Sequence, residues 1–286
     1  MLPVKVVLLT GGSSGIGLSI AEKLAREGYR VYAASRRAGA VRNAPERNGT
    51  AASADPGVLL PGAPIPFFMD VDDDRSVEDG IVEILSREGR LDIVICNAGF
   101  GVAGAVEETA VDEAEAQMET NFFGTFRVLR AALPILRRQG GGRVVAIGSV
   151  GGFVALPFQA IYSSSKAAVD ALVSALAVEA APFGIRCTLV QPGDIRTGFT
   201  AARRLCRQAT DPDSPYSAAF RRSIGRMERD EQNGMSPDVL ARCVSRILRR
   251  RRPPPKVTPG AFYRLVAAAH RLLPTRFFRW IVSILY

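Results

Sequence analysis

Histidine is nearly absent from this chain: of its 286 residues, only His270 is a histidine. Because Ser-His-Asp chemistry needs a histidine beside the nucleophile, and His270 lies outside every motif, the sequence argues against that chemistry. Four widely spaced cysteines without a C-x-x-C pair argue against a zinc site as well, so no metal is expected. Cys96 and Cys187 lie in apolar runs and are predicted to be buried structural thiols.

Long apolar runs are also missing, since none approaches the roughly 18 residues that a membrane-spanning helix needs. Residues 1–10 are apolar but lack a charged segment and a small-residue cleavage site, so they predict a strand and not a signal peptide. With an apolar content of 47%, the expected product is a globular cytoplasmic protein.

Lysine is scarce, with four of the 37 basic residues. The net charge of +9 is concentrated in residues 197–286, which hold 18 basic and 6 acidic groups. Two interpretations stand: a compositional preference for surface arginine, or a surface for anionic partners such as lipid headgroups. No nucleic-acid partner is expected.

Short apolar runs alternate with helical patterns, which predicts an α/β fold: one Rossmann-type domain over residues 1–260, with a doubly wound parallel sheet of about seven strands. Strands are predicted at residues 4–9, 30–35, 65–68, 91–96, 143–148 and 185–190. Helices are predicted at residues 16–27, 75–88, 111–138, 159–181 and 236–250. Residues 37–64 are expected to be irregular, and residues 198–234 to form a mobile surface loop that sets the substrate.

The tail, residues 261–286, is predicted to be an amphipathic helical extension broken at Pro274. It has an apolar stripe and arginines at 264, 271, 276 and 279. Two locations are open for it: packing over the substrate pocket or another subunit, or a peripheral contact with a membrane surface.

A glycine-rich turn, Thr10-Gly-Gly-Ser-Ser-Gly-Ile-Gly17, follows the first strand and opens a helix. Glycines let backbone amides approach a pyrophosphate, and the helix N-terminus adds partial positive charge. The turn predicts dinucleotide binding, although a structural turn is the alternative.

Tyr162 and Lys166 stand four residues apart and share one face of a predicted helix. A nearby ammonium favours the tyrosinate, so we expect Lys166 to lower the pKa of the phenol toward working pH. Tyr162 would then serve as a general acid and base.

Together with Asn97-Ala98-Gly99, Asn121, Ser149 and Pro192-Gly193, these motifs make residues 4–200 resemble the short-chain dehydrogenase/reductase family. The resemblance implies that Tyr162 exchanges a proton with the substrate oxygen and that Ser149 hydrogen-bonds this oxygen. It implies that Lys166 contacts the nicotinamide ribose and that Asn121 holds a water in a proton relay.

The same resemblance implies a set of cofactor-binding residues around the sheet. They are Gly11, Ser13, Ser14, Gly15, Ile16, Gly17, Ser35, Arg36, Asp70, Val71, Asn97, Ala98, Gly99, Tyr162, Lys166, Pro192, Gly193, Ile195 and Thr197. NAD enzymes place an acidic residue after the second strand. Ser35-Arg36-Arg37 stands there instead and predicts NADP(H), because arginine pairs with a 2′-phosphate.

The predicted function is NADP(H)-dependent interconversion of an alcohol and its ketone or aldehyde on a lipophilic small molecule, in a hydroxysteroid- or retinol dehydrogenase-like branch. A fatty-acyl or polyketide-type ketoreductase and a catalytically silent NADP-binding regulatory protein remain alternatives. A homodimer or homotetramer is expected, because the two long helices have apolar residues on more than one face.

Overall fold

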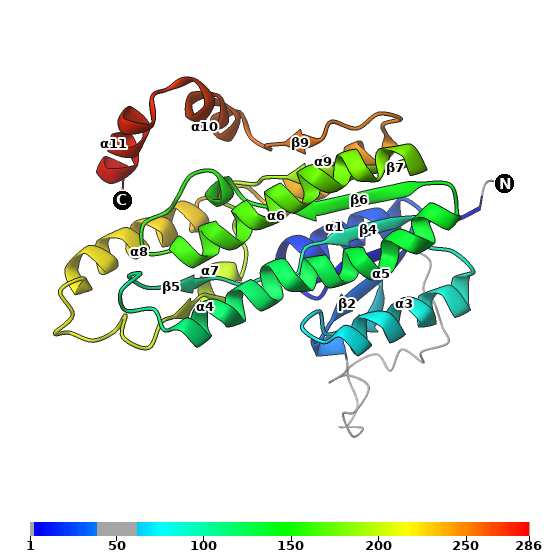
Figure 1. Ribbon diagram of the computed structural model, residues 1–286, viewed down its shortest axis with the longest axis horizontal. Helices are drawn as coiled ribbons and strands as arrows, with labels where there is room; N and C mark the ends of the chain where they lie inside the picture. Colours follow the sequence, from blue (N-terminus) through cyan, green and yellow to red (C-terminus); the bar gives the residue numbers. More distant parts are fainter. Residues whose placement is uncertain (1–2, 39–61, 286) are drawn as a thin grey trace.

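The computed structural model describes residues 3–38 and 62–285, and its main feature is a seven-stranded parallel sheet in the order β3-β2-β1-β4-β6-β7-β9 (Figure 1). The strands are β1 (Val6–Thr10), β2 (Arg30–Ser35), β3 (Ile65–Phe68), β4 (Ile93–Cys96), β6 (Gly142–Ile147), β7 (Ile185–Val190) and β9 (Lys256–Val257). The strand order reverses between β1 and β4, and ligands bind at the carboxyl ends of the strands at such a point. The predicted doubly wound sheet is confirmed.

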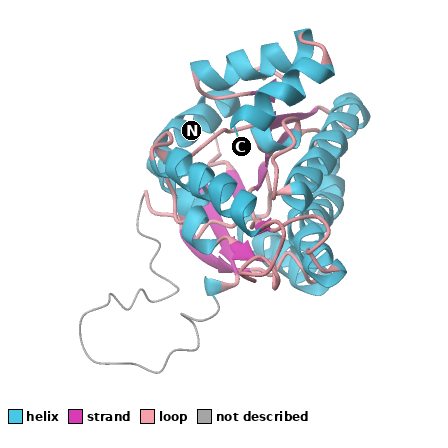
Figure 2. Ribbon diagram, turned by 90° about the vertical axis from the view of Figure 1, so that its left-hand side faces the viewer, coloured by secondary structure: helices cyan, strands magenta, loops and turns pink. Residues whose placement is uncertain are grey.

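Helices cover both faces of the sheet because its strands are apolar on both faces (Figures 1 and 2). In β1, Val7 and Leu9 pack with α1 (Gly15–Arg26) and α9 (Pro237–Arg249). Val6 and Leu8 lie in the opposite core, with α3 (Asp74–Glu88), α5 (Gly124–Arg138) and α6 (Ala160–Glu179). Short 3-10 turns, η2 (Val150–Gly152) and η3 (Ala181–Phe183), lead into and out of α6.

All four cysteines are buried free thiols, as predicted for Cys96 and Cys187. Burial raises the pKa of Cys96 to about 12, so this thiol is unreactive. Within the described part of the chain, one helix, α6, is long and apolar enough to cross a membrane. It contacts β7 and η2, which is also the behaviour of a core helix in a globular protein.

The helix predicted over residues 111–138 is interrupted. It consists of α4 (Val111–Met118), the π-helical turn η1 (Glu119–Phe123) and α5. The hydroxyl of Thr125, at the start of α5, donates to the backbone oxygen of Asn121 in this turn at 2.9 Å. Single π turns are often found at functional positions, and this one contains Asn121.

The prediction of a mobile loop over residues 198–234 is wrong. This segment forms α7 (Phe199–Ala202), β8 (Arg204–Leu205) paired with β5 (Val102–Ala103), and the long helix α8 (Ser217–Gln232). Phe220, Ile224 and Met227 on α8 are buried in a small core with β5, which orders the segment. Of the irregular stretch predicted at 37–64, residues 39–61 lie outside the described residues.

The tail forms two helices, α10 (Ala261–Leu272) and α11 (Thr275–Leu285), separated at Pro274 as predicted. In Figure 1 they lie at the upper left, beyond β9 and on the same side as α8. Their apolar residues Val266, Ala269 and Ile281 line the cavity described below.

Candidate active site

The turn between β1 and α1 brings the first turn of α1 to the carboxyl edge of the sheet. Gly11 and Gly15 have φ angles of +67° and +53°, in the left-handed region that favours glycine. A Cβ atom on Gly17 would lie 2.1 Å from the carbonyl oxygen of Gly11, so a larger residue would displace the turn. Ser14 makes no side-chain hydrogen bond at the helix N-terminus. The backbone amides of this turn can therefore bind a phosphate.

Asn97, at the end of β4, fixes this turn. Its side-chain amide donates to the carbonyl oxygens of Thr10 and Gly11, both at 3.1 Å. The Thr10 hydroxyl in turn accepts from the backbone amides of Asn97 and Ala98. The predicted Asn97-Ala98-Gly99 segment thus lies beside the glycine turn, where β1 and β4 meet.

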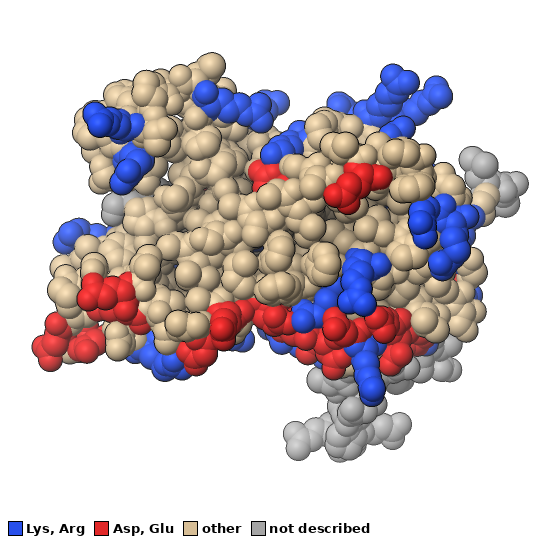
Figure 3. Space-filling model, viewed as in Figure 1, with Lys and Arg blue, Asp and Glu red and all other residues tan. Residues whose placement is uncertain are grey.

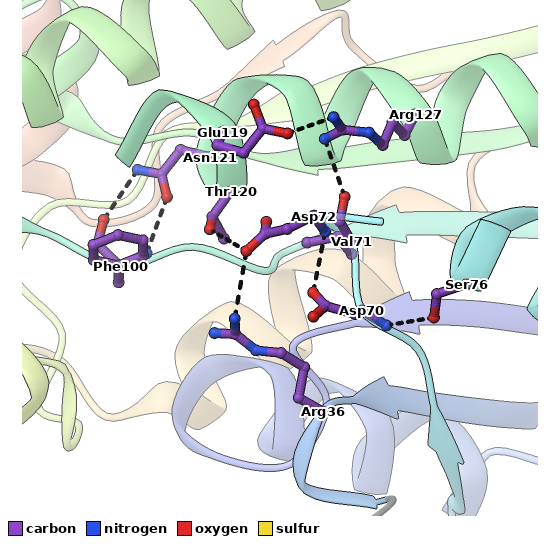
Figure 4. Close-up of polar contacts among 10 residues, drawn as sticks. All are labelled: Arg36, Asp70, Val71, Asp72, Ser76, Phe100, Glu119, Thr120, Asn121 and Arg127. Atoms are coloured by element: carbon purple, nitrogen blue, oxygen red, sulfur yellow. Dashed lines mark hydrogen bonds and ion pairs between the residues drawn. The ribbon is translucent and has the colours of Figure 1, made fainter. Parts of the chain in front are cut away.

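Ser35 and Arg36 follow β2 at the same edge. The buried hydroxyl of Ser35 has no hydrogen-bond partner, which fits a polar ligand group at this position. The Arg36 side chain is 56% exposed, and its Nη1 lies 3.4 Å from Oδ2 of Asp72 (Figure 4). Asp72 also accepts from the hydroxyl of Thr120 at 2.9 Å. Sequence reasoning missed Asp72, which holds Arg36 next to the cavity.

Asp70 and Val71 follow β3 (Figure 4). The backbone amide of Asp70 donates to the Ser76 hydroxyl at 2.9 Å. Its carboxylate accepts from the backbone amide of Asp72 at 3.1 Å. These bonds fix the conformation of the segment that the sequence predicts to contact adenine.

Ser149, Tyr162 and Lys166 meet at the carboxyl end of β6. Ser149 ends that strand and accepts from the backbone amide of Gly151 at 3.0 Å. The Lys166 Nζ donates to the carbonyl oxygen of Ile147 at 2.9 Å and lies 5.9 Å from the centre of the Tyr162 ring. The ring of Phe199 lies 5.8 Å from that of Tyr162.

The expected lowering of the phenol pKa by Lys166 is wrong for this structure. Burial raises the pKa of Tyr162, the hydrogen bond with Ser149 lowers it, and the charge of Glu231 raises it further. Burial also lowers the pKa of Lys166 from 10.5 to about 8. The physical reason is that the surrounding protein desolvates both side chains, while the Lys166 ammonium donates to the backbone carbonyl of Ile147.

Asn121 lies behind this group and does not line the cavity. Its Oδ1 accepts from the backbone amide of Phe100, and its Nδ2 donates to the Phe100 carbonyl, each at 3.0 Å (Figure 4). Its Nδ2 also donates to the Ser165 hydroxyl at 3.0 Å. The side chain therefore connects the segment after β4 to the helix that holds Tyr162.

The segment after β7, Pro192 to Thr197, lies against both the glycine turn and the tail. A Cβ atom on Gly15 would lie 3.4 Å from that of Thr197. One on Gly193 would lie 2.1 Å from the ring of Tyr263 in α10. The Tyr263 hydroxyl donates to Oδ2 of Asp194 at 2.6 Å.

These segments enclose one cavity of about 1310 Å³. Every predicted site residue except Asn121 lines it. Its other half is largely apolar, and the tail contributes to it, in agreement with one of the two locations that the sequence left open for the tail. This half includes Val154, Leu156, Phe199, Met227, Phe262, Leu265, Val266, Ala269, Phe278, Ile281 and Val282. The tail stripe was visible in the sequence, whereas its place over Tyr162 required the fold.

The apolar half also contains carboxylates that sequence reasoning missed. Glu231 accepts from the Thr200 hydroxyl at 2.5 Å and pairs with Arg203, whose side chain is 1% exposed. Burial raises the pKa values of both Glu231 and Asp194. Among the described residues, no group of three or more histidine, cysteine or acidic side chains could hold a metal ion.

Comparison with known proteins gives consistent results. Residues 5–207 match the family model described as short chain dehydrogenase. The chain is 35% identical to a 3-ketodihydrosphingosine reductase of Bacteroides thetaiotaomicron, over 99% of this chain and 98% of the relative. It is 39% identical to human 17-beta-hydroxysteroid dehydrogenase type 1 over 68% of this chain and 58% of that protein. A solved short-chain dehydrogenase from Streptomyces avermitilis superposes with a TM-score of 0.79 at 31% identity, covering 95% of this chain and 93% of that one.

Proposed function

The chain belongs to the short-chain dehydrogenase/reductase family, with relatives in its hydroxysteroid dehydrogenase-like branch, and from this premise we propose that it interconverts an alcohol and its ketone or aldehyde with NADP(H), on a lipophilic substrate. That it is an oxidoreductase with a nicotinamide dinucleotide cofactor follows from the family. The choice of NADP(H), the type of reaction and the class of substrate are the proposal.

The observation that carries the proposal is the meeting of Tyr162, Ser149 and Lys166 with the glycine turn in one cavity. In reduction, Tyr162 donates its proton to the carbonyl oxygen, and Ser149 stabilises the charge that develops there. Lys166 would hold the nicotinamide ribose, whereas Asn121, outside the cavity, would support the proton relay only by fixing the segment after β4 against α6. The dinucleotide, when bound, supplies the hydride.

The preference for NADP(H) rests on Arg36 and Ser35. A guanidinium pairs with a 2′-phosphate, and the unpartnered Ser35 hydroxyl can donate to it. Arg36→Asp should lower kcat/KM with NADPH by about 10- to 100-fold, because it replaces attraction with repulsion. Arg75→Asp, at an exposed arginine outside the cavity, is the matched control. Equal kcat/KM values with NADPH and NADH in the unmodified protein would contradict the assignment.

The apolar half of the cavity favours a lipophilic substrate. The relative that matches over nearly the whole chain is called a 3-ketodihydrosphingosine reductase, a name that denotes a long-chain ketone with a primary amine beside the carbonyl. We therefore place long-chain ketones first, ahead of steroid, retinoid and sugar ketones.

The test is to assay a panel of these ketones with NADPH and to measure turnover as the loss of nicotinamide absorbance. We expect turnover of long-chain ketones and little turnover of sugar ketones. Tight NADPH binding without turnover of any ketone or aldehyde would instead identify a catalytically silent binding protein. Turnover of acyl-carrier-protein thioesters alone would identify the fatty-acyl type of ketoreductase.

We further propose a homodimer or homotetramer and a cytoplasmic protein that contacts a membrane surface through its tail. Beyond the apolar residues that line the cavity, the tail exposes Leu272, Phe277, Trp280 and Ile284. Arginines lie on the same two helices (Figure 3). Such a combination suits an anionic lipid surface from which a lipophilic substrate would come.

A further inference from the structure

The substrate half of the cavity contains five charged side chains. Four of them already have a partner in the structure, either a side chain of opposite charge or an aromatic ring. The Arg204 guanidinium lies over the ring of Phe100, 4.4 Å from its centre. Arg226 lies 3.7 Å from the carboxylate of Asp230. Glu231 pairs with the buried Arg203.

The fifth, Asp194, has no arginine or lysine nitrogen within 4 Å among the described residues. Its carboxylate accepts a hydrogen bond from the hydroxyl of Tyr263, at 2.6 Å. The carboxylate is half-buried and lines the cavity directly after Pro192 and Gly193. The Asp194 carboxylate is partly withdrawn from water, and the cation that compensates its charge, Arg203, acts on it only through longer-range attraction. Its charged form is therefore destabilised by burial, and a cation directly beside it would offset that cost.

We propose that Asp194 is a specificity-determining residue that binds the cationic nitrogen of a substrate whose ketone has a protonated amine beside it, while the alkyl chain lies along α8, α10 and α11. The proposal rests on the proposed function. It adds that the substrate is positively charged and that Asp194 binds this charge.

The position of Asp194 agrees with this role. The pKa of Tyr162 is raised by burial, by the charge of Glu231 and, to a smaller extent, by the charge of Asp194. Asp194 and Tyr162 line the same cavity, so a substrate whose carbonyl meets the phenol can direct an adjacent group toward this carboxylate. The apolar lining from Met227, Leu265, Phe278 and Val282 continues from there. The cavity thus combines a carboxylate that has no ion pair among the described residues with an extensive apolar lining.

Asp194 could instead serve only to hold α10 through Tyr263. Two variants separate these roles. Asp194→Asn removes the charge but keeps an oxygen that accepts from Tyr263. Tyr263→Phe removes the hydrogen bond but keeps the carboxylate. Asp230→Asn removes a carboxylate in the same cavity that is already paired with an arginine, and it is the matched control.

The experiment compares two substrates with NADPH at about pH 6.5, where an amine of this kind is protonated. One is a long-chain 2-amino-3-ketone, and the other is the same ketone with hydrogen in place of the amine. We expect the unmodified protein to prefer the amino ketone in kcat/KM. Asp194→Asn should reduce that preference by about 10- to 100-fold, mainly through KM, since hydrogen bonds to charged groups have this magnitude. Tyr263→Phe and Asp230→Asn should preserve it.

No preference in the unmodified protein, or an equal loss for both ketones in Asp194→Asn, would overturn the inference while leaving the proposed function intact. If neither ketone is turned over, the proposed function fails. The inference is then tested by titrating the NADPH-bound protein with the corresponding long-chain amino alcohol. Binding is measured from the change in cofactor fluorescence. Binding that is unchanged in Asp194→Asn would overturn it there also.

Discussion

Tyr162 must hold its proton to act as a general acid, and its surroundings favour the protonated phenol. Burial and the charge of Glu231 both raise its pKa, and only the hydrogen bond with Ser149 and the charge of Arg203 oppose them. Tyr162→Phe should therefore lower kcat for reduction by about 10²- to 10⁴-fold, the usual contribution of a positioned acid. NADPH affinity should change little, because most cofactor contacts come from other residues. The measurement pairs turnover with a fluorescence titration of NADPH, and near-normal turnover would remove Tyr162 from the mechanism.

Lys166 leads to a prediction about pH. Burial lowers its pKa to about 8 in the cofactor-free protein. Below that pH the ammonium is already present when the negatively charged dinucleotide binds, whereas above it binding must take up a proton. NADPH affinity should therefore fall as pH rises through about 8, by up to about tenfold per pH unit.

The measurement is a fluorescence titration of NADPH between about pH 6.5 and pH 9.5. Lys166→Ala should bind more weakly and lose this dependence. A dependence that persists in Lys166→Ala would assign the titration to another group.

At this scale the sequence predicts residues whose role depends on local spacing, such as Tyr162 and Lys166 on one helix. It did not predict the direction of the phenol pKa. The pKa of the phenol is raised first by burial and then by the charge of Glu231, which comes from a distant segment. Asp194 was passed over for a similar reason, since its lack of an ion pair is visible only when all neighbours are placed.

Among the elements, the sequence did not predict α8, the π turn, the short helix α7 or the two-residue strands β5, β8 and β9. The stripe Phe220, Ile224 and Met227 has helical spacing, but the many charged residues of α8 concealed it. The π turn at Glu119–Phe123 leaves hydrophobic periodicity almost unchanged, so a pattern cannot reveal it. The six strands predicted from apolar runs were found because strands buried on both faces leave an unbroken signal.

The contact of α10 with Gly193 gives a prediction for an element. A Cβ atom on Gly193 would lie 2.1 Å from the ring of Tyr263, which is too close for both to keep their positions. Gly193→Ala should therefore displace α10 and speed proteolytic cleavage of the tail several-fold. Tyr263→Ala in the same chain should remove the clash and reduce that added sensitivity.

Gly225→Ala is the control for this experiment. That glycine lies within α8 and has only the end of the Arg229 side chain near its Cβ position, so the substitution should leave cleavage of the tail unchanged. Equal cleavage in Gly193→Ala and the unmodified protein would show that α10 is not held against Gly193.

For the whole molecule, exposed aromatic residues near the start of α5 support an assembly. Phe123 and Phe126 are 44% and 42% exposed. We expect light scattering to give at least twice the 30.7 kDa of one chain. Phe126→Arg should shift the protein toward the monomer if this face is the interface, whereas Val82→Arg, at an exposed position on α3, should not. A monomer at micromolar concentration in the unmodified protein would contradict the assembly.

The tail gives the last prediction. Its inner residues line the cavity, while Leu272, Phe277, Trp280 and Ile284 are exposed and Phe277 stacks with Trp280 at 5.5 Å between ring centres. If this outer face contacts lipid, the full chain should sediment with anionic vesicles, less with neutral ones, and less in high salt. Trp280→Gln combined with Leu272→Gln should weaken sedimentation and preserve turnover of a water-soluble ketone, because neither residue lines the cavity. Deletion of 261–286 separates the two roles of the tail. If this truncation loses activity but still sediments with vesicles as the full chain does, the membrane contact is wrong, and the tail serves only to close the cavity.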